Sequence, residues 1–368
     1  MPHLGGVEKF SQSIAAELAK DSQVTVFCMN TEKQPAVKQE GEVTIHFLPC
    51  FVLQKGRFPV PKPSAVRFLR RWFSKNHVDF GIVQCRFYLL SWIGCELLAR
   101  RKIPFIQIDH GAGDVPMPDP LTERIWHFYD NLLTRLEMRH PHDVYAVSEA
   151  GLKWLEHYGI HGTGIISNSI APADFDEALS SPGIWRKKHH IPDHALIITF
   201  TGRIMKEKGV IDLLEAFEQL KGDDLFLVAA GDGNMQLVRP WTGRPNILFP
   251  GQVPFAEIPS LLADTGIFCL PSRFVEGKPT GVLEAGYCAK AVAATGSGGT
   301  TEIIPDERYG KLVPAGDVPA LTQALQELID HPEMRESMGC NLRQRVIEKF
   351  TWETAANEVR KAMRNYGL

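Results

Sequence analysis

Two glutamates, Glu276 and Glu284, lie eight positions apart in the stretch EGKPTGVLEAG, just after an apolar run. The residues between them include a proline, a threonine and two glycines. By spacing alone, two such carboxylates could be unrelated surface charges. Whether they act together depends on the other polar motifs of the chain and on the elements that position them.

The stretch GRIMKEKG, from Gly202, is a second candidate for chemistry. It follows the apolar run LIITFT directly and opens the helical pattern VIDLLEAFEQL. Backbone N–H groups at a helix start favour an anion. Arg203 adds a bidentate fork and Lys208 a point charge, so together they could clamp a diphosphate. A solvated basic turn is the alternative when this stretch is considered by itself.

His110 is a third candidate, because it ends the strand-like run FIQID and precedes the glycine-containing loop GAG. The carboxyl end of a strand is where ligands bind in an open α/β sheet. Its neighbour Asp109 either shares this role or turns the chain. A structural histidine is the alternative interpretation.

Several other classes of site find no support. GAGDVP at Gly111 and GSGGTT at Gly296 do not fit the dinucleotide fingerprint, and no P-loop or H-E-x-x-H motif occurs. The D-x-D triplet at 174–176 is too short to indicate a metal site. The seven cysteines are odd in number and form no C-x-x-C pair, which argues against disulfides and zinc. No basic block suggests nucleic-acid binding.

Length and composition indicate an ordinary globular protein with two domains. The chain has 368 residues, of which 44% are hydrophobic and 23% charged, and its formal net charge is −3. It contains no signal-peptide pattern and no apolar run of about 18 residues. We therefore expect a cytoplasmic protein that does not span a membrane.

Strand-like apolar runs alternate with helical patterns along the chain, which predicts parallel sheets covered by helices. One series of runs begins at residues 24, 43, 80, 104, 144 and 163, and a second begins at residues 196, 225, 246, 266, 291 and 310. The polar stretch 178–195 between the two series is interpreted as a linker. The chain opens with a Gly-Gly turn and a helix without a preceding strand, so we expect that its numbering begins inside the natural protein.

The motifs, in this order, resemble those of family 4 glycosyltransferases over nearly the whole chain. They are GGVE near the start, DHG at Asp109, SNSIAPADF at Ser167, GRIMKEKG, AAGDG at Ala229, PSRFVEGKPTGVLEAG at Pro271 and SGGTTEII at Ser297. The glutamate pair is similar to the E-x7-E motif of retaining, nucleotide-sugar-dependent enzymes. The resemblance implies an α/β protein of the GT-B fold, with two Rossmann-like, doubly wound parallel-sheet domains facing a central cleft.

The same resemblance implies roles for individual residues. Glu284, at a helix start, would accept hydrogen bonds from the nucleotide ribose, and Glu276 would face the donor sugar; with Pro279 between them, the pair must span a loop and a helix start. Arg203 and Lys208 would neutralise the diphosphate, and His110 would contact the sugar. The expected donor-binding residues are Gly5, Gly6, Gly202, Gly231, Gly277, Lys278, Pro279, Thr280, Gly281 and Glu284.

The implied reaction is the transfer of a sugar, with retention, from a nucleoside diphosphate sugar to a glycan or lipid-linked acceptor. No cofactor and no metal are expected, because Arg203 and Lys208 do the neutralising. A sugar-nucleotide epimerase of the same fold and a non-catalytic nucleotide-sugar-binding protein remain alternatives. The expected division is an acceptor-side domain at 1–178, a nucleotide-sugar-binding domain at 179–350 and a closing helix at 351–368 that crosses back.

The segment 61–75, PKPSAVRFLRRWFSK, carries five basic residues, no acid and several aromatic ones. It could form an amphipathic basic helix that rests on an anionic membrane, as a lipid-linked acceptor would require. An ordinary surface helix with snorkelling arginines is the alternative. We therefore expect a cytoplasmic enzyme. On the first interpretation of this segment, the enzyme is peripheral on the inner face of the membrane. The sequence does not specify the nucleotide base, the donor sugar or the acceptor.

Overall fold

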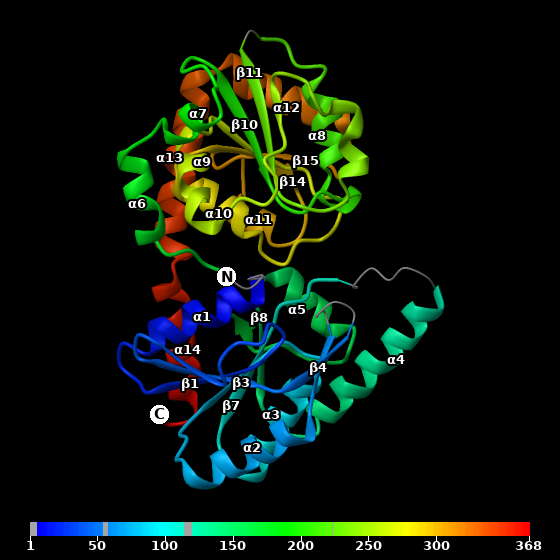
Figure 1. Ribbon diagram of the computed structural model, residues 1–368, viewed down its shortest axis with the longest axis vertical. Coiled ribbons are helices and arrows are strands. Elements are labelled where there is room, and N and C mark those ends of the chain that lie inside the picture. Colours follow the sequence, from blue (N-terminus) through cyan, green and yellow to red (C-terminus); the bar gives the residue numbers. More distant parts are fainter. Residues whose placement is uncertain (1–5, 54–57, 114–119, 223) are drawn as a thin grey trace. The chain divides into compact units, whose positions relative to one another are not determined.

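The computed structural model describes residues 6–53, 58–113, 120–222 and 224–368. The chain divides into two compact units, one formed by Met1–Ser167 with Trp352–Leu368 and the other by Asn168–Thr351 (Figure 1). The division after Ser167 comes before the expected boundary at 178. Within the described residues, no helix is both long enough and apolar enough to cross a membrane.

The second unit contains one sheet of six parallel strands in the order β12-β11-β10-β13-β14-β15. All six strands correspond to apolar runs in the sequence. Their residues are largely buried because helices cover both faces of a parallel sheet. The bounds are β10 Leu196–Thr201, β11 Leu225–Ala230, β12 Ile247–Leu248, β13 Ile267–Leu270, β14 Ala291–Thr295 and β15 Lys311–Val313.

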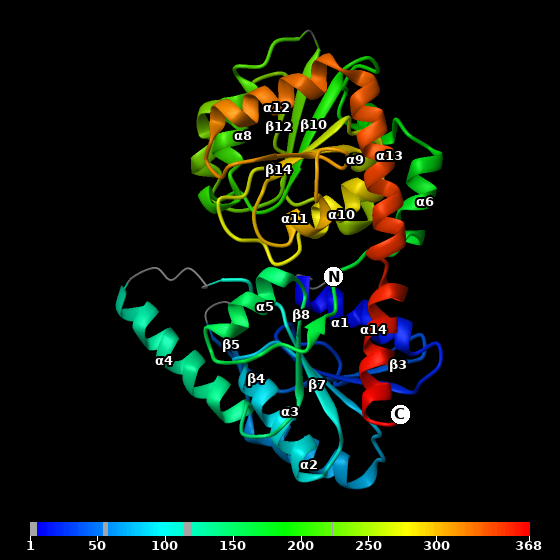
Figure 2. The same ribbon diagram turned by 180° about the vertical axis from the view of Figure 1, so that it is seen from behind.

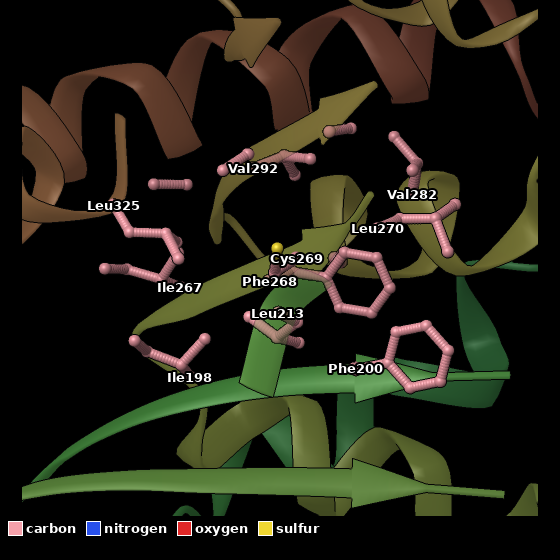
Figure 3. Close-up of a cluster of buried hydrophobic side chains, with 14 of the residues drawn as sticks. Ile198, Phe200, Leu213, Ile267, Phe268, Cys269, Leu270, Val282, Val292 and Leu325 are labelled. Atoms are coloured by element: carbon pink, nitrogen blue, oxygen red, sulfur yellow. The ribbon is translucent and has the colours of Figure 1, made fainter. Parts of the chain in front are cut away.

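The core of this unit lies between the sheet and its helices. Figure 3 shows Phe200 of β10 and Phe268 of β13 among aliphatic side chains of the sheet and of the helices that cover it. Both rings are fully buried. The α-helices are α6 Ala173–Ser180, α7 Ile184–Lys188, α8 Val210–Phe217, α9 Ile258–Asp264, α10 Thr280–Tyr287, α11 Thr300–Ile303, α12 Val318–Asp330 and α13 Pro332–Lys349, with 3-10 turns η2 Lys206–Lys208, η3 Met235–Trp241 and η4 Phe255–Glu257.

The stretch interpreted as a linker is folded into the second unit. The Trp185 side chain of α7 is 2% exposed and packs with Ile191 and neighbouring core residues. The Asp264 carboxylate accepts hydrogen bonds from the backbone N–H of Gly183 at 2.5 Å and of Arg186 at 2.9 Å. This segment is therefore part of the second unit, because the Trp185 ring and the two hydrogen bonds to Asp264 fix it there.

The first unit contains two sheets and a hairpin instead of one doubly wound sheet. The sheet orders are β1-β3-β2, with β2 antiparallel, and β6-β7-β8-β9, all parallel; β4 and β5 pair with each other. Strands β2, β4 and β5 were not expected. The bounds are β1 Val24–Met29, β2 Val37–Glu40, β3 Val43–Leu48, β4 Cys50–Leu53, β5 Phe58–Pro61, β6 Gly81–Gln84, β7 Phe105–Asp109, β8 Asp143–Ala146 and β9 Gly164–Ile165.

Helices of the first unit come from both ends of the sequence. The last helix, α14, lies beside the first, α1, as both views show (Figures 1 and 2). The Phe10 and Trp352 rings are 5.4 Å apart, and Arg360 Nε donates a hydrogen bond to Asp21 at 2.8 Å. The helix bounds are α1 Gly6–Leu18, α2 Pro63–Lys75, α3 Leu89–Arg100, α4 Pro120–Glu137, α5 Glu149–Glu156 and α14 Trp352–Asn365.

Candidate functional site

The strand order of the second unit identifies where a ligand would bind. From β10 the chain moves to β11 and β12 on one side, whereas β13 leads to β14 and β15 on the other. Strands β10 and β13 are neighbours, so the order reverses between them. Ligands of open α/β sheets bind outside the carboxyl ends of the strands at such a switch point. The loops that leave β10 and β13 there are the two with Arg203 and Glu276.

Glycines allow the turns at this edge to approach one another closely. A Cβ on Gly231 would lie 1.8 Å from the Gly202 carbonyl oxygen, and a Cβ on Gly209 would lie 1.8 Å from the Pro271 oxygen. Gly209 also has φ +70°, in the left-handed region that favours glycine. The turns after β10, β11 and β13 therefore pack backbone against backbone, which fixes their mutual positions.

Lys208 and Glu276, expected to serve the diphosphate and the sugar, lie in direct contact. Lys208 Nζ is 2.6 Å from Glu276 Oε1, and it also lies 5.3 Å from the centroid of the Phe274 ring. The side chains are 23% and 10% exposed. Arg203 is exposed, and among the described carboxylates none pairs with it. The edge thus carries the exposed Arg203 guanidinium in the same turn as the largely enclosed Lys208–Glu276 ion pair.

A second turn holds the glutamate loop in place. The Gly299 N–H donates a hydrogen bond to the Glu276 carbonyl at 2.9 Å. A Cβ on Gly298 would lie 2.1 Å from that same carbonyl oxygen, and one on Gly299 would lie 2.0 Å from the Gly277 oxygen. The Ser-Gly-Gly turn after β14 therefore supports the backbone that carries Glu276.

Helix α10 begins at Thr280, directly after the loop, with Pro279 at its N-cap position. Gly281 lets the helix approach the sheet, because a Cβ there would lie 2.9 Å from Thr201 Oγ1 and 3.0 Å from Phe268 Cζ. Glu284 is 7% exposed and lies in the second turn, one turn further along the helix than expected. The two glutamates do span a loop and a helix.

Lys278 was expected among the donor-binding residues, but its side chain is turned into the protein. It is 2% exposed, its Nζ is 2.6 Å from Glu302 Oε2, and it lies 5.1 Å from the centroid of the Phe350 ring. Asn168 Nδ2 donates a hydrogen bond to the Lys278 carbonyl at 3.1 Å. The Lys278 side chain and carbonyl are therefore both engaged within the protein. Sequence reasoning missed its partner Glu302, although the motif that contains it was noted.

In the first unit, His110 follows β7 and is held on two sides. Its Nε2 is 2.9 Å from Gln84 Oε1, and the edge of the Phe10 ring lies against it, with centroids 4.7 Å apart. Burial lowers its pKa to about 4, so the ring is neutral at pH 7. With Gln84 Oε1 as acceptor, Nε2 carries the proton and Nδ1 is an acceptor. Gly6 opens α1, four residues before Phe10; Gly5 lies outside the described residues.

Asp109 has a structural role beside His110. It is 1% exposed and accepts a hydrogen bond from the Arg86 N–H at 3.2 Å, while burial raises its pKa despite the nearby guanidinium. Arg86 Nη1 is 2.5 Å from Asp130 Oδ1, and its guanidinium lies 3.7 Å from the centroid of the Tyr158 ring. Sequence reasoning missed this network and Gln84. One feature of the sequence could have indicated them. Gln84 lies near the end of the apolar run FGIVQC, and Arg86 follows that run directly.

The D-x-D triplet at 174–176 has a structural role. Asp176 of the D-x-D triplet accepts a hydrogen bond from the Tyr287 hydroxyl at 2.6 Å, which ties α6 to α10. Among the described side chains, no group of three or more His, Cys, Asp or Glu is arranged to hold a metal ion.

Comparison with known proteins assigns the chain to a family. The family model described as Glycosyltransferase Family 4 matches residues 4–173, and the model described as Glycosyl transferases group 1 matches residues 183–345. Together the two matches cover most of each unit. The chain belongs to the family 4 glycosyltransferases.

Two curated relatives of this glycosyltransferase match it over nearly their full length. An uncharacterized glycosyltransferase of Methanocaldococcus jannaschii is 24% identical over 98% of this chain and 95% of its own. The GDP-mannose-dependent alpha-(1-6)-phosphatidylinositol monomannoside mannosyltransferase of Mycolicibacterium smegmatis is 23% identical over 96% of this chain and 93% of its own.

Solved structures confirm the fold of the glycosyltransferase. The sucrose-phosphate synthase of Thermosynechococcus elongatus superposes with a TM-score of 0.79 at 19% identity, covering 98% of this chain and 94% of that one. The prediction of a GT-B fold is therefore correct, although the strands of the first unit form two sheets.

Proposed function

We propose that this glycosyltransferase moves a sugar, with retention, from a nucleoside diphosphate sugar to a glycan or lipid-linked acceptor, in the synthesis of cell-surface polysaccharide or glycolipid. One observation carries the proposal. At the switch point of the second unit, exposed Arg203, the Lys208–Glu276 pair and the start of α10 converge at the edge where ligands of this sheet type bind. Cations, backbone N–H groups and a carboxylate are what a sugar diphosphate requires.

The proposed chemistry depends on charge separation between the sugar and the departing diphosphate. Arg203 binds the diphosphate through its guanidinium fork, and Lys208 adds a second positive charge. The N–H groups at the start of α10 supply further donors. Lys208 and the N–H groups at the start of α10 are held in place before reaction, so they stabilise the developing negative charge without reorganising. Retention is proposed from the E-x7-E pattern, with Glu276 at the sugar and Glu284 at the ribose.

His110 is proposed to contact the donor sugar as a neutral hydrogen-bonding group. The Gln84 contact and the lowered pKa support this role, because an uncharged ring with a fixed proton can accept a hydrogen bond from a sugar hydroxyl through Nδ1. We also propose that no metal or cofactor takes part, since Arg203 and Lys208 supply the positive charge that a divalent cation would otherwise provide.

A peripheral position on the cytoplasmic face of a membrane is part of the proposal. In α2, the Trp72 ring packs against Phe27, with centroids 4.9 Å apart, whereas Arg67, Arg70 and Arg71 are exposed. A row of exposed arginines can bind anionic headgroups. The phosphatidylinositol mannoside mannosyltransferase among the relatives supports a lipid-linked acceptor.

A thermal-shift screen with UDP-, GDP-, ADP- and dTDP-sugars tests the donor site. We expect one nucleotide sugar to raise the melting temperature by several degrees, and Glu284→Ala to abolish the shift. Glu333→Ala, on the exposed surface of α13, is the matched control and keeps the shift. The absence of a shift with every donor, or an unchanged shift in Glu284→Ala, would refute the donor site.

Retention is tested on the donor that binds. Slow hydrolysis of this donor releases a free sugar, whose first-formed anomer is read by proton NMR before mutarotation. An anomer with the donor's configuration supports retention, and the opposite anomer contradicts it. Conversion of the donor sugar to its epimer, without transfer, would instead identify an epimerase. Chelation with EDTA leaves the rate unchanged if no metal takes part.

A further inference from the structure

Helix α4 of the first unit exposes an apolar ridge that the proposed reaction does not use. Leu121 is 69% exposed, Ile125 62%, Phe128 71% and Leu132 45%. Their spacing of four, three and four residues places them on one side of the helix. Contiguous exposed apolar side chains of this size mark an interaction surface.

The opposite side of α4 fixes which way this ridge points. Asp130 forms the ion pair with Arg86, and Thr134 Oγ1 accepts a hydrogen bond from Arg86 Nη1 at 2.8 Å. One turn further, Glu137 accepts a hydrogen bond from Gln107 Nε2 at 3.0 Å. These contacts are buried. The helix cannot turn its apolar side inward without breaking a buried ion pair and leaving its partner uncompensated, which is strongly unfavourable.

The surroundings of the ridge are basic. Arg124 and Arg135 are exposed and, by helical spacing, flank Ile125 and Phe128 on one side. The acids of α4 lie elsewhere on the helix, at Glu123, Asp130 and Glu137. Figures 1 and 2 show α4 at the outer edge of the first unit, and in both views no other described element covers its outward side.

We propose that this face of α4 is a docking surface for an anionic lipid bilayer. Apolar side chains insert between the lipid headgroups, and the flanking arginines bind phosphates while their stems stay in apolar surroundings. A second copy of the chain fits less well, because pairing along the ridge would gather four arginines with no acid from the same face to balance them. The α2 face differs, since only Phe68, 38% exposed, is a large apolar side chain exposed on its helix.

This inference deepens the lipid-linked part of the proposed function, but it does not depend on sugar transfer. Binding of the full chain to vesicles is measured by sedimentation, without donor, using phosphatidylcholine alone and phosphatidylcholine with phosphatidylglycerol. We expect binding to the anionic vesicles. The double variant Ile125→Ser/Phe128→Ser should bind about tenfold more weakly or worse, because two inserted side chains are lost.

Controls separate this surface from the alternatives. Ile347→Ser, at a residue 45% exposed on α13, should bind as the wild type does. Arg124→Glu/Arg135→Glu should also lose binding, which provides a second test if the serine variant folds poorly. Melting temperatures and the nucleotide-sugar thermal shift should stay unchanged in all variants, so that failure of the donor site is distinguishable from failure of membrane binding.

Three results would overturn the proposal. The first is a wild type that does not bind anionic vesicles. The second is unchanged binding in both α4 variants, including the case in which only Arg67→Ala/Arg70→Ala on α2 reduces it. The third is a wild-type dimer in light scattering that Ile125→Ser/Phe128→Ser converts to a monomer, which would make the ridge an interface between copies.

Discussion

Lys278 shows how one enclosed ion pair can stabilise a functional loop. Its ammonium group is nearly inaccessible to water and 2.6 Å from Glu302, which is itself 19% exposed. Removing one partner leaves a partly buried charge uncompensated, so Lys278→Met should lower the free energy of unfolding by about 3 kcal/mol. Replacing both charges, as in Lys278→Met/Glu302→Gln, should restore most of this loss. Urea unfolding of both variants measures the difference, and equal stability of the two would contradict it.

Glu137 gives stability a specific pH dependence. Burial raises its pKa from 4.5 to about 8, so the folded chain retains a proton that the unfolded chain releases. The stabilising contribution of this group is complete below about pH 4.5 and is lost as the pH rises through about 8. Glu137→Gln should therefore be more stable than wild type at pH 8 by about 1–3 kcal/mol, with no advantage at pH 4.

The melting temperatures of wild type and Glu137→Gln, recorded from pH 4 to pH 8.5, measure this effect. Glu123→Gln, at an exposed residue of the same helix, serves as the control and should follow the wild-type curve. A constant difference between Glu137→Gln and wild type across this range would show that the carboxyl does not titrate as described.

Among the elements, α7 is a short, basic helix that is nevertheless anchored in the core of the second unit by one side chain. Trp185 is 2% exposed, whereas its neighbour Ile184 is 54% exposed. Trp185→Ala should cost about 3–5 kcal/mol, because it leaves a large cavity between α7 and the sheet. Ile184→Ala is the matched control and should have little effect. If both variants unfold at the same urea concentration as the wild type, the segment is a linker after all.

Apolar runs were sufficient to predict the elements that form the two cores. Every expected strand is present, because a parallel strand that is buried on both faces has a nearly continuous apolar sequence. The segment 178–195 was misjudged because its fold depends on one tryptophan and on Asp264, which is distant in sequence. Strands β2, β4 and β5 are short and partly exposed, so their pattern is weak.

The candidate site could be predicted at the level of loops but not of side-chain partners. The Arg203 and Glu276 loops do lie together, since strand order brings the ends of β10 and β13 to one edge. Nothing local indicates that Lys278 turns inward to Glu302 or that Lys208 meets Glu276, because these contacts join different turns. The apolar residues of α4 have the spacing that is typical of a buried helix face. In the structure this face is exposed, so the spacing alone would have predicted the wrong environment.

At the scale of the whole molecule, each unit has its own core and should melt as its own transition. Trp352, 3% exposed, belongs to the first unit, where its ring packs against Phe10, and Leu342, fully buried, belongs to the second. Trp352→Ala should lower only one of two calorimetric transitions and Leu342→Ala only the other. The donor should raise the transition that Leu342→Ala lowers. A single transition shifted by both variants would show that the units unfold together.

The pairing of α1 with α14 has a consequence for how the chain is made. The first unit needs residues 352–365, which leave the ribosome after the whole second unit. Translation of the intervening 184 residues, 168–351, takes roughly ten to forty seconds at usual rates. During that interval Phe10 lacks the Trp352 ring against which it packs, so the nascent N-terminal half is exposed to chaperones and to aggregation. The second unit, synthesised later, can complete its fold first.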